Sequence, residues 1–218
     1  CGIMDQFASV FGKAGSLMRL DCRSLEFKYF PFDPKGYKLV LLNSQVKHDL
    51  ASSAYNDRRK SCENVVAAMK KHWPNVDSLR DATYDMLDEV RPEVSEEDAL
   101  RAKYVIGEKY RVLEVCVALE EGDYEEVGKK MYETHYGLSK EYEVSCPELD
   151  FLNDVAHSCG VTGSRIMGGG FGGCTINLVS DDLYANFIET AKKAYKEKFG
   201  KEPIVIDVVI GDGSRKLC

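Results

Sequence analysis

The sequence predicts an α+β fold made of one large domain or two small ones. Short apolar runs typical of strands are spread far apart along the chain, segments with helical periodicity lie between them, and no internal repeat is present. The 218 residues are enough to bury a sizeable core. A composition of 44% hydrophobic and 30% charged residues excludes disordered, collagen-like and coiled-coil chains.

The first predicted elements are a short helix and two strands. Residues 2–8 resemble the start of a helix, and residues 16–32 predict a pair of strands separated by a turn around 22–24, because apolar residues alternate in the second run. The turn signal Asp33-Pro34-Lys35-Gly36 precedes a continuous apolar strand over 37–44. We expect a domain boundary near this turn.

Helices are predicted through the middle of the chain. A periodic segment over 52–73 ends before Pro74. Ser95-Glu96-Glu97-Asp98 has the pattern of a capping box, ahead of a long helix that ends at Gly122. Ser145-Cys146-Pro147-Glu148 is a second capping signal, for a helix that stops near residue 158. The long helix is predicted to bury one stripe of residues: Ala102, Val105, Ile106, Tyr110, Leu113, Cys116 and Val117.

The last third of the chain combines strands with one helix. Residues 164–167 and 175–179 predict short strands on either side of a glycine run. An amphipathic helix over 182–198 and a buried strand over 204–209 complete the pattern.

Charge and cysteine content exclude several classes of function. Lys and Arg number 29 against 36 Asp and Glu, which gives a net charge of −7 with no basic run. This balance argues against broad nucleic-acid or anionic-membrane binding. The eight cysteines contain no Cys-x-x-Cys pair, and the four histidines are not at ligand spacing to them. We therefore expect no zinc site and no disulfide framework, but reduced thiols as in a cytoplasmic protein.

The run Gly168-Gly169-Gly170-Phe171-Gly172-Gly173 is the strongest candidate for a binding site. Five glycines in six positions allow positive φ angles and close backbone approach, and successive amides can form a nest for an anion such as phosphate. A strand follows the run, so a dinucleotide-binding Rossmann turn is excluded, and the protein-kinase and Walker A signatures are missing. The alternative is a tight glycine hairpin without a ligand.

Two further candidates are individual polar side chains. Asp5 could accept a proton from a substrate hydroxyl, or it could only complement the dipole of the helix it begins. Arg58 and Arg59 could bind phosphate or a carboxylate with Tyr55 in a pocket, or they could form a solvated helix face. The four histidines, His48, His72, His135 and His157, stand singly and support no cluster.

Several segments, taken together and in order, resemble the galactokinase family of the GHMP small-molecule kinases. They are Cys1-Gly2-Ile3-Met4-Asp5-Gln6-Phe7, Asp21-Cys22-Arg23-Ser24-Leu25, Val46-Lys47-His48 with Ser52-Ser53-Ala54-Tyr55, and the segments 142–150 and 163–174. This resemblance implies ATP-dependent phosphorylation of α-D-galactose at its C1 hydroxyl, with galactose and ATP as the molecules bound. Asp5 matches the catalytic aspartate of the family, and Gly2 and Tyr55 match positions that contact the sugar. The glycines 168, 169, 170, 172 and 173 match the third family motif, near the phosphates.

The resemblance also implies that parts of the site lie outside this sequence. The first family motif, with a transition-state arginine and sugar ligands, and the second, which wraps ATP and supplies a Mg²⁺ ligand, are not present. We therefore expect no metal ligand here and a C-terminal portion that is inactive alone. The implied fold is a ferredoxin-like GHMP kinase C-terminal domain with extra helices over 36–218, after a remnant of the N-terminal domain over 1–35. Strands at 38–44, 164–168, 174–179 and 204–209 would form its four-stranded antiparallel sheet.

Two alternatives stay open at this point. The parent protein could be a GHMP kinase of a related sugar, such as N-acetylgalactosamine or arabinose, since residues that choose the sugar are expected outside this sequence. It could also be a non-catalytic sensor that binds galactose and ATP.

Overall fold

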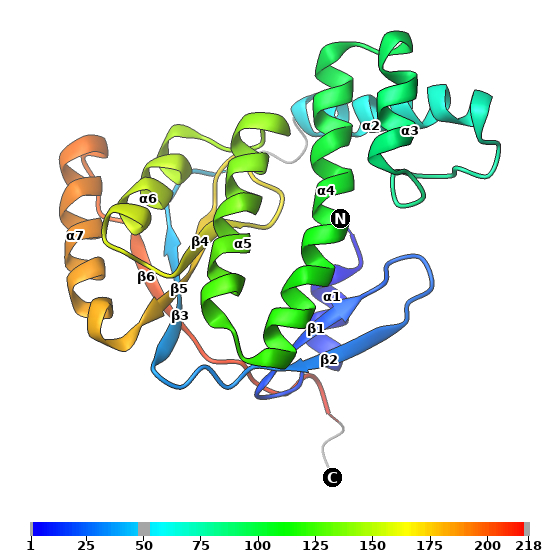
Figure 1. The fold of residues 1–218 in the computed structure, drawn as a ribbon. Helices are drawn as coiled ribbons and strands as arrows, with labels where there is room; N and C mark the ends of the chain where they lie inside the picture. Colours follow the sequence, from blue (N-terminus) through cyan, green and yellow to red (C-terminus); the bar gives the residue numbers. More distant parts are fainter. Residues whose placement is uncertain (1, 48–52, 216–218) are drawn as a thin grey trace.

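A four-stranded antiparallel sheet is the centre of the fold. The computed structural model describes residues 2–47 and 53–215. The sheet has the order β4 (Gly163–Met167), β5 (Cys174–Ser180), β3 (Tyr37–Asn43) and β6 (Ile204–Val208), and every neighbouring pair is antiparallel (Figure 1). The predicted strands and their arrangement are confirmed to within about one residue.

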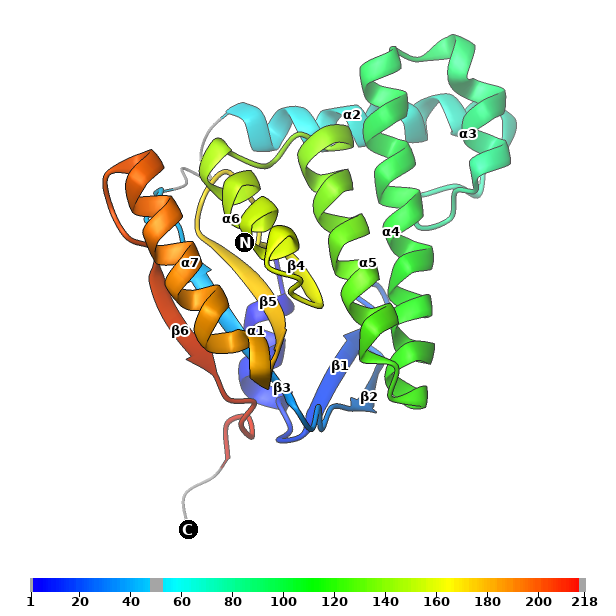
Figure 2. The same cartoon turned by 60° about the vertical axis from the view of Figure 1, so that its left-hand side comes forward.

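One face of the sheet is covered by two amphipathic helices. Figure 2 shows α6 (Pro147–Ser158) and α7 (Asp181–Phe199) on the same side of the sheet. Because side chains alternate along a strand, Val40 and Leu42 of β3 point to this side together and are fully buried with Phe187 and Tyr195 of α7. The side chains of Met167, Ile204 and Ile206 point to the other face of the sheet, and all three are exposed.

The N-terminal segment packs against the rest of the chain. Helix α1 (Met4–Phe11) precedes β1 (Ser16–Leu20) and β2 (Phe27–Pro31), which pair antiparallel as predicted. Phe30 and Phe32 share a hydrophobic cluster with Leu119 and Leu178. The amide of Gly213 donates to the carbonyl of Gly12 at 2.7 Å, so the end of the described chain lies beside α1. The division at residues 35 and 36 stays a prediction.

The turn between β1 and β2 is held to the helical part by two reciprocal ion pairs. Arg23 donates to both carboxylate oxygens of Asp81, at 2.8 and 2.9 Å, and Arg80 pairs with Asp21. The hydrogen bonds from Arg80 hold the pKa of Asp21 well below its usual range. The segment 21–24 thus has a structural role, which is to fix the first hairpin to the loop after α2.

A helical layer forms a second core beside the sheet. It contains α2 (Ser53–His72), α3 (Tyr84–Val90), the 3₁₀ turn η1 (Arg91–Glu93), α4 (Glu96–Glu121), α5 (Tyr124–Tyr136) and the π-helical turn η2 (Gly137–Glu141). Helix α3 was not predicted. Met69, Val90 and Ile106 are fully buried where α2, α3 and α4 meet. The side chain of Ser95 accepts from the amide of Asp98 at 3.0 Å, which confirms the predicted cap of α4.

Two expectations about the helices are wrong. Ala102, Ile106 and Cys116 are buried, but Tyr110, Leu113 and Val117 are 37%, 47% and 52% exposed. Helix α4 contacts α2 and α3 as well as α5 and β2, so its buried face changes along its 26 residues. The second cap also differs, because Cys146 takes the N-cap position of α6 and makes no side-chain cap.

The hydroxyl that was expected to cap α6 instead binds Asp150. Ser145 Oγ donates to Asp150 Oδ1 at 2.5 Å, Ser139 Oγ donates to Oδ2 at 2.9 Å, and His135 Nε2 lies 3.3 Å from Oδ1. Burial alone would raise the pKa of Asp150, but hydrogen bonds from His135, Ser145 and Ser139 outweigh it and lower the pKa to about 2. This carboxylate therefore joins α5, η2 and the start of α6.

Helix α5 lies unusually close to the edge strand β4. A Cβ atom on Gly128 would lie 2.1 Å from the carbonyl oxygen of Thr162, which is backbone and cannot rotate away. We therefore expect Gly128→Ala to lower the free energy of unfolding by about 2 kcal/mol or more, despite the better helix propensity of alanine. Chemical denaturation measures this.

A second helical glycine provides the control for this variant. A Cβ on Gly107 of α4 would lie 2.7 Å from the hydroxyl of Tyr84, which is the end of a half-exposed side chain that can move. Gly107→Ala should therefore change stability much less. Equal stability of the Gly128 variant and the wild type would contradict the close approach.

The carboxylate of Asp150 predicts a pH-dependent contribution to stability. Its pKa in the folded chain is about 2, below the ordinary value of 3.8, so the stabilisation is complete above the unfolded pKa and is lost as pH falls toward 2. Allowing for screening of a side chain that is 31% exposed, Asp150→Asn should lower the free energy of unfolding at pH 7 by roughly 1–2 kcal/mol.

Denaturation of the wild type and the variant between pH 7 and pH 2 measures this contribution. The difference between them should shrink below about pH 4. Asp154→Asn is the control, because Asp154 is an exposed carboxylate on the same helix. A difference that does not change with pH would rule out this role of the Asp150 carboxylate.

Candidate functional site

The glycine run forms the loop between β4 and β5 and is seated on two other segments. The amide of Phe171 donates to the carbonyl of Val144 at 2.6 Å, and the amide of Gly173 donates to the carbonyl of Val46 at 3.1 Å. The hydroxyl of Ser44 donates to the carbonyl of Gly173 at 2.8 Å. The loop therefore has a fixed place against the end of β3 and the segment before α6.

Glycine is required at two positions of this loop. Gly170 and Gly172 have φ angles of +83° and +140°, and a Cβ there would lie 2.1 Å from the carbonyl oxygen of Val144 and 2.6 Å from that of Val46. Both residues are buried, whereas Gly168 and Gly169 are exposed. Part of the glycine content thus serves packing, and two of the amides predicted to face an anion donate to the protein itself.

Helix α2 reaches the loop through one of its two candidate arginines. Arg58 donates from Nε to the carbonyl of Tyr142 at 2.9 Å and from Nη2 to the carbonyl of Glu143 at 2.6 Å, and its guanidinium carbon lies 5.8 Å from the centre of the Phe171 ring. Arg59 is exposed and pairs with Glu63 of the next turn. The solvated-face interpretation therefore holds for Arg59 and is wrong for Arg58.

The sugar-site candidates are accessible among the described residues. Tyr55, one turn before Arg58, is 50% exposed, and Asp5 is exposed in the first turn of α1. A Cβ on Gly2 would meet nothing within 4 Å. In Figures 1 and 2 the first turn of α1 points toward the end of the sheet where the glycine loop lies. His48, which belongs to one of the segments of the family resemblance, lies outside the described residues.

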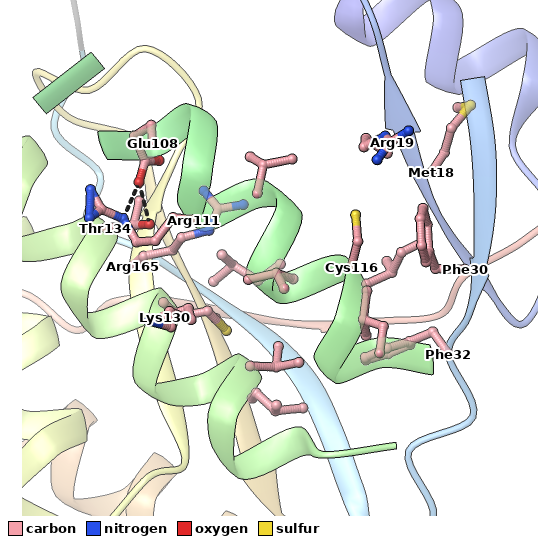
Figure 3. A pocket seen from close by; sticks show the side chains of 18 of the residues that line it. Met18, Arg19, Phe30, Phe32, Glu108, Arg111, Cys116, Lys130, Thr134 and Arg165 are labelled. Carbon is pink, nitrogen blue, oxygen red and sulfur yellow. Dashed lines mark hydrogen bonds and ion pairs between the residues drawn. The ribbon is translucent and has the colours of Figure 1, made fainter. Parts of the chain in front are cut away.

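A separate cavity lies between the first hairpin, helices α4 and α5 and the sheet (Figure 3). Its volume is about 410 Å³, and apolar side chains such as Phe30, Phe32 and Leu178 line most of it. At one end Glu108 accepts from Thr134 at 2.9 Å, close to Arg165, whose pKa is lowered by burial. None of the predicted site residues lines this cavity.

The described ranges contain neither a metal-ligand cluster nor a membrane-spanning helix. Residues 2–47 and 53–215 bring together no group of three His, Cys, Asp or Glu side chains suited to a metal ion. No helix in the same ranges is both long enough and apolar enough to cross a bilayer.

The sequence did not reveal which residues hold the glycine loop in place. The carbonyls of Val144 and Val46 hold the loop, and a backbone carbonyl carries no residue-type signal. Glu143, which precedes Val144, has a φ of +53° that is uncommon for a non-glycine residue. The available signal was the segment 142–150, which belonged to the family resemblance but had no assigned role.

Comparison with known proteins agrees with the fold. Residues 116–197 match the family model described as GHMP kinases C terminal. The whole chain is 42% identical to the galactokinases of Clostridium beijerinckii and Homo sapiens, of which it covers 56% and 54%, and 38% identical to that of Thermotoga maritima, of which it covers 60%. The chain thus spans little more than half the length of these curated relatives.

Solved structures give the same result. The crystal structure of Lactococcus lactis galactokinase complexed with galactose matches 100% of this chain and 56% of its own, with a TM-score of 0.92 and 30% identity. L. major mevalonate kinase shares the fold with a TM-score of 0.57 at 20% identity, over 92% of this chain and 50% of its own. Residues 116–197 therefore match the C-terminal domain of the GHMP kinases, and the chain as a whole is similar in sequence and fold to galactokinases.

Proposed function

We propose that this chain is the C-terminal part of a galactokinase, which transfers the γ-phosphoryl group of ATP to the C1 hydroxyl of α-D-galactose and releases galactose 1-phosphate and ADP. The observation that carries the proposal is the similarity to galactokinases over the full chain, supported by the TM-score of 0.92 with a galactokinase that was crystallised with galactose. Relatives with other substrates match at lower identity.

Asp5 is the proposed catalytic carboxylate. Its side chain is exposed at the start of α1, and the described residues place no ion-pair partner against it. As the C1 oxygen bonds to the γ-phosphorus and the bond from that phosphorus to the β–γ bridging oxygen breaks, Asp5 would take the hydroxyl proton. Gly2 and Tyr55 are the proposed sugar contacts. The space beside Gly2 is open, because a Cβ atom there would meet no described atom within 4 Å.

The glycine loop is proposed to lie near the phosphates of ATP. Since the amides of Phe171 and Gly173 already donate to carbonyls, an anion would meet the remaining amides, at Gly168, Gly169, Gly170 and Gly172. Bound Mg²⁺ would neutralise phosphate charge during transfer. As the family resemblance implies, its ligands are proposed to lie mainly outside this sequence.

We also propose a cytoplasmic location. The six described cysteines that carry a free thiol support it, because a reducing compartment keeps thiols unpaired.

We expect the 218-residue chain and the complete gene product to differ in enzymatic turnover. We expect the complete gene product to release ADP only when ATP and galactose are both present, and the purified 218-residue chain to release none above background. A coupled ADP assay measures both. Turnover by the 218-residue chain would contradict the proposal that it is inactive alone. Phosphorylation of another sugar in place of galactose would contradict the proposed substrate.

The role of Asp5 predicts a loss of turnover without a loss of sugar binding. Asp5→Asn in the complete protein should lower kcat by about 100-fold or more, because the proton acceptor is removed while the shape is kept. Steady-state kinetics and galactose titration measure the two effects. Asp85→Asn is the control, since Asp85 is an exposed acid in the first turn of the short helix α3. An equal loss of kcat in both variants would contradict a catalytic role and leave Asp5 only the role of complementing the dipole of α1.

A further inference from the structure

Arg58 connects three parts of the molecule that are far apart in sequence. It leaves α2 and donates to two consecutive carbonyls, of Tyr142 and Glu143, at 2.9 and 2.6 Å. The carbon of its guanidinium lies over the ring of Phe171, at 5.8 Å from the ring centre. Its side chain is only 14% exposed. The charge of this group is therefore used inside the protein and is not presented to solvent.

The carbonyls that Arg58 holds are adjacent to the one that seats the glycine loop. Val144 follows Glu143 directly, and its carbonyl accepts from the amide of Phe171 at 2.6 Å. Gly170 approaches the same carbonyl so closely that a Cβ would lie 2.1 Å from it. A shift of the segment 142–144 would therefore move the loop with it.

A second arginine fixes the same segment from α4. Arg101 is buried and donates to Glu143 Oε2 at 2.9 Å and to Ser61 Oγ of α2 at 2.8 Å. It donates to the side chain of Glu143, whereas Arg58 donates to the main chain and lies 3.9 Å from the same carboxylate oxygen. Only Arg58 also contacts the glycine loop itself, through Phe171.

The helix that carries Arg58 also carries the proposed sugar contact. Tyr55 is three positions earlier, so the two side chains are neighbours on the surface of α2. We propose that Arg58 is a positioning residue, which sets the glycine loop at a fixed distance from the part of α2 that bears Tyr55. For phosphoryl transfer, this distance aligns the phosphate with the sugar hydroxyl, and in this respect the inference rests on the proposed function.

The geometry requires arginine and not only a positive charge. A planar guanidinium can donate to two carbonyls from its edge while its face covers an aromatic ring. A lysine ammonium is a single point with no face, so it cannot make all three contacts. The conservative variant Arg58→Lys therefore tests the geometry separately from the charge.

The first measurement is amide hydrogen exchange in the complete gene product and in its variants Arg58→Ala, Arg58→Lys and Arg59→Ala. Exchange over 168–173 should become about 10-fold faster in both Arg58 variants, and exchange in β3 and β5 should change little. Arg59→Ala should match the wild type, because Arg59 is exposed and its ion pair among the described residues is to Glu63 of its own helix. Unchanged loop exchange, or an equal increase throughout the sheet, would overturn the positioning role.

The second measurement is kinetic. If Arg58 aligns loop and helix, Arg58→Lys should lower kcat by about 10-fold or more and change the KM for galactose less than about 3-fold, because α2 keeps Tyr55 in place. Kinetic constants equal to those of Arg59→Ala would contradict the inference. If the wild type does not phosphorylate galactose, the proposed function fails, and hydrogen exchange alone then decides whether Arg58 positions the loop.

Discussion

The hydrogen bond from the amide of Phe171 to the carbonyl of Val144 determines how the rest of the site is built. The two backbones approach so closely that residue 170 has no room for a side chain, and its positive φ also favours glycine. Because Val144 lies between η2 and α6, the place of the glycine loop depends on how these helical segments are fixed. The site is therefore supported from the helical layer as well as from the sheet.

Charged side chains supply that support. Asp150 joins three hydrogen-bonding side chains, His135, Ser139 and Ser145, which come from both sides of Val144 in the sequence. Arg58 and Arg101 hold Glu143 from α2 and α4. Each of these groups is partly or wholly buried and partnered, which makes its geometry definite. A loop rich in glycine is thus kept in one conformation by residues outside it.

Much of the fold follows from local signals in the sequence. The four strands of the sheet were predicted because short apolar runs are bounded by turn residues, and the cap at Ser95 because a hydroxyl precedes a helical stripe at the right spacing. The stripe of α4 was only half right, since periodicity shows that a helix has an apolar face but not which neighbours cover each turn. Likewise, Ser145 has the residue type of a helix cap, yet its hydroxyl donates a hydrogen bond to the carboxylate of Asp150.

The sequence by itself determined the strands, most helices and the identity of the loop, because these depend on residue type and spacing. Gly2 came from resemblance alone, and the resemblance chose between the alternatives that the residues left open for Asp5 and Tyr55. Only the tertiary structure decided that Arg58 faces inward, that Gly170 and Gly172 serve close packing, and that two loop amides are already satisfied. These features depend on backbone carbonyls of residues distant in sequence, and a carbonyl is the same in every amino acid.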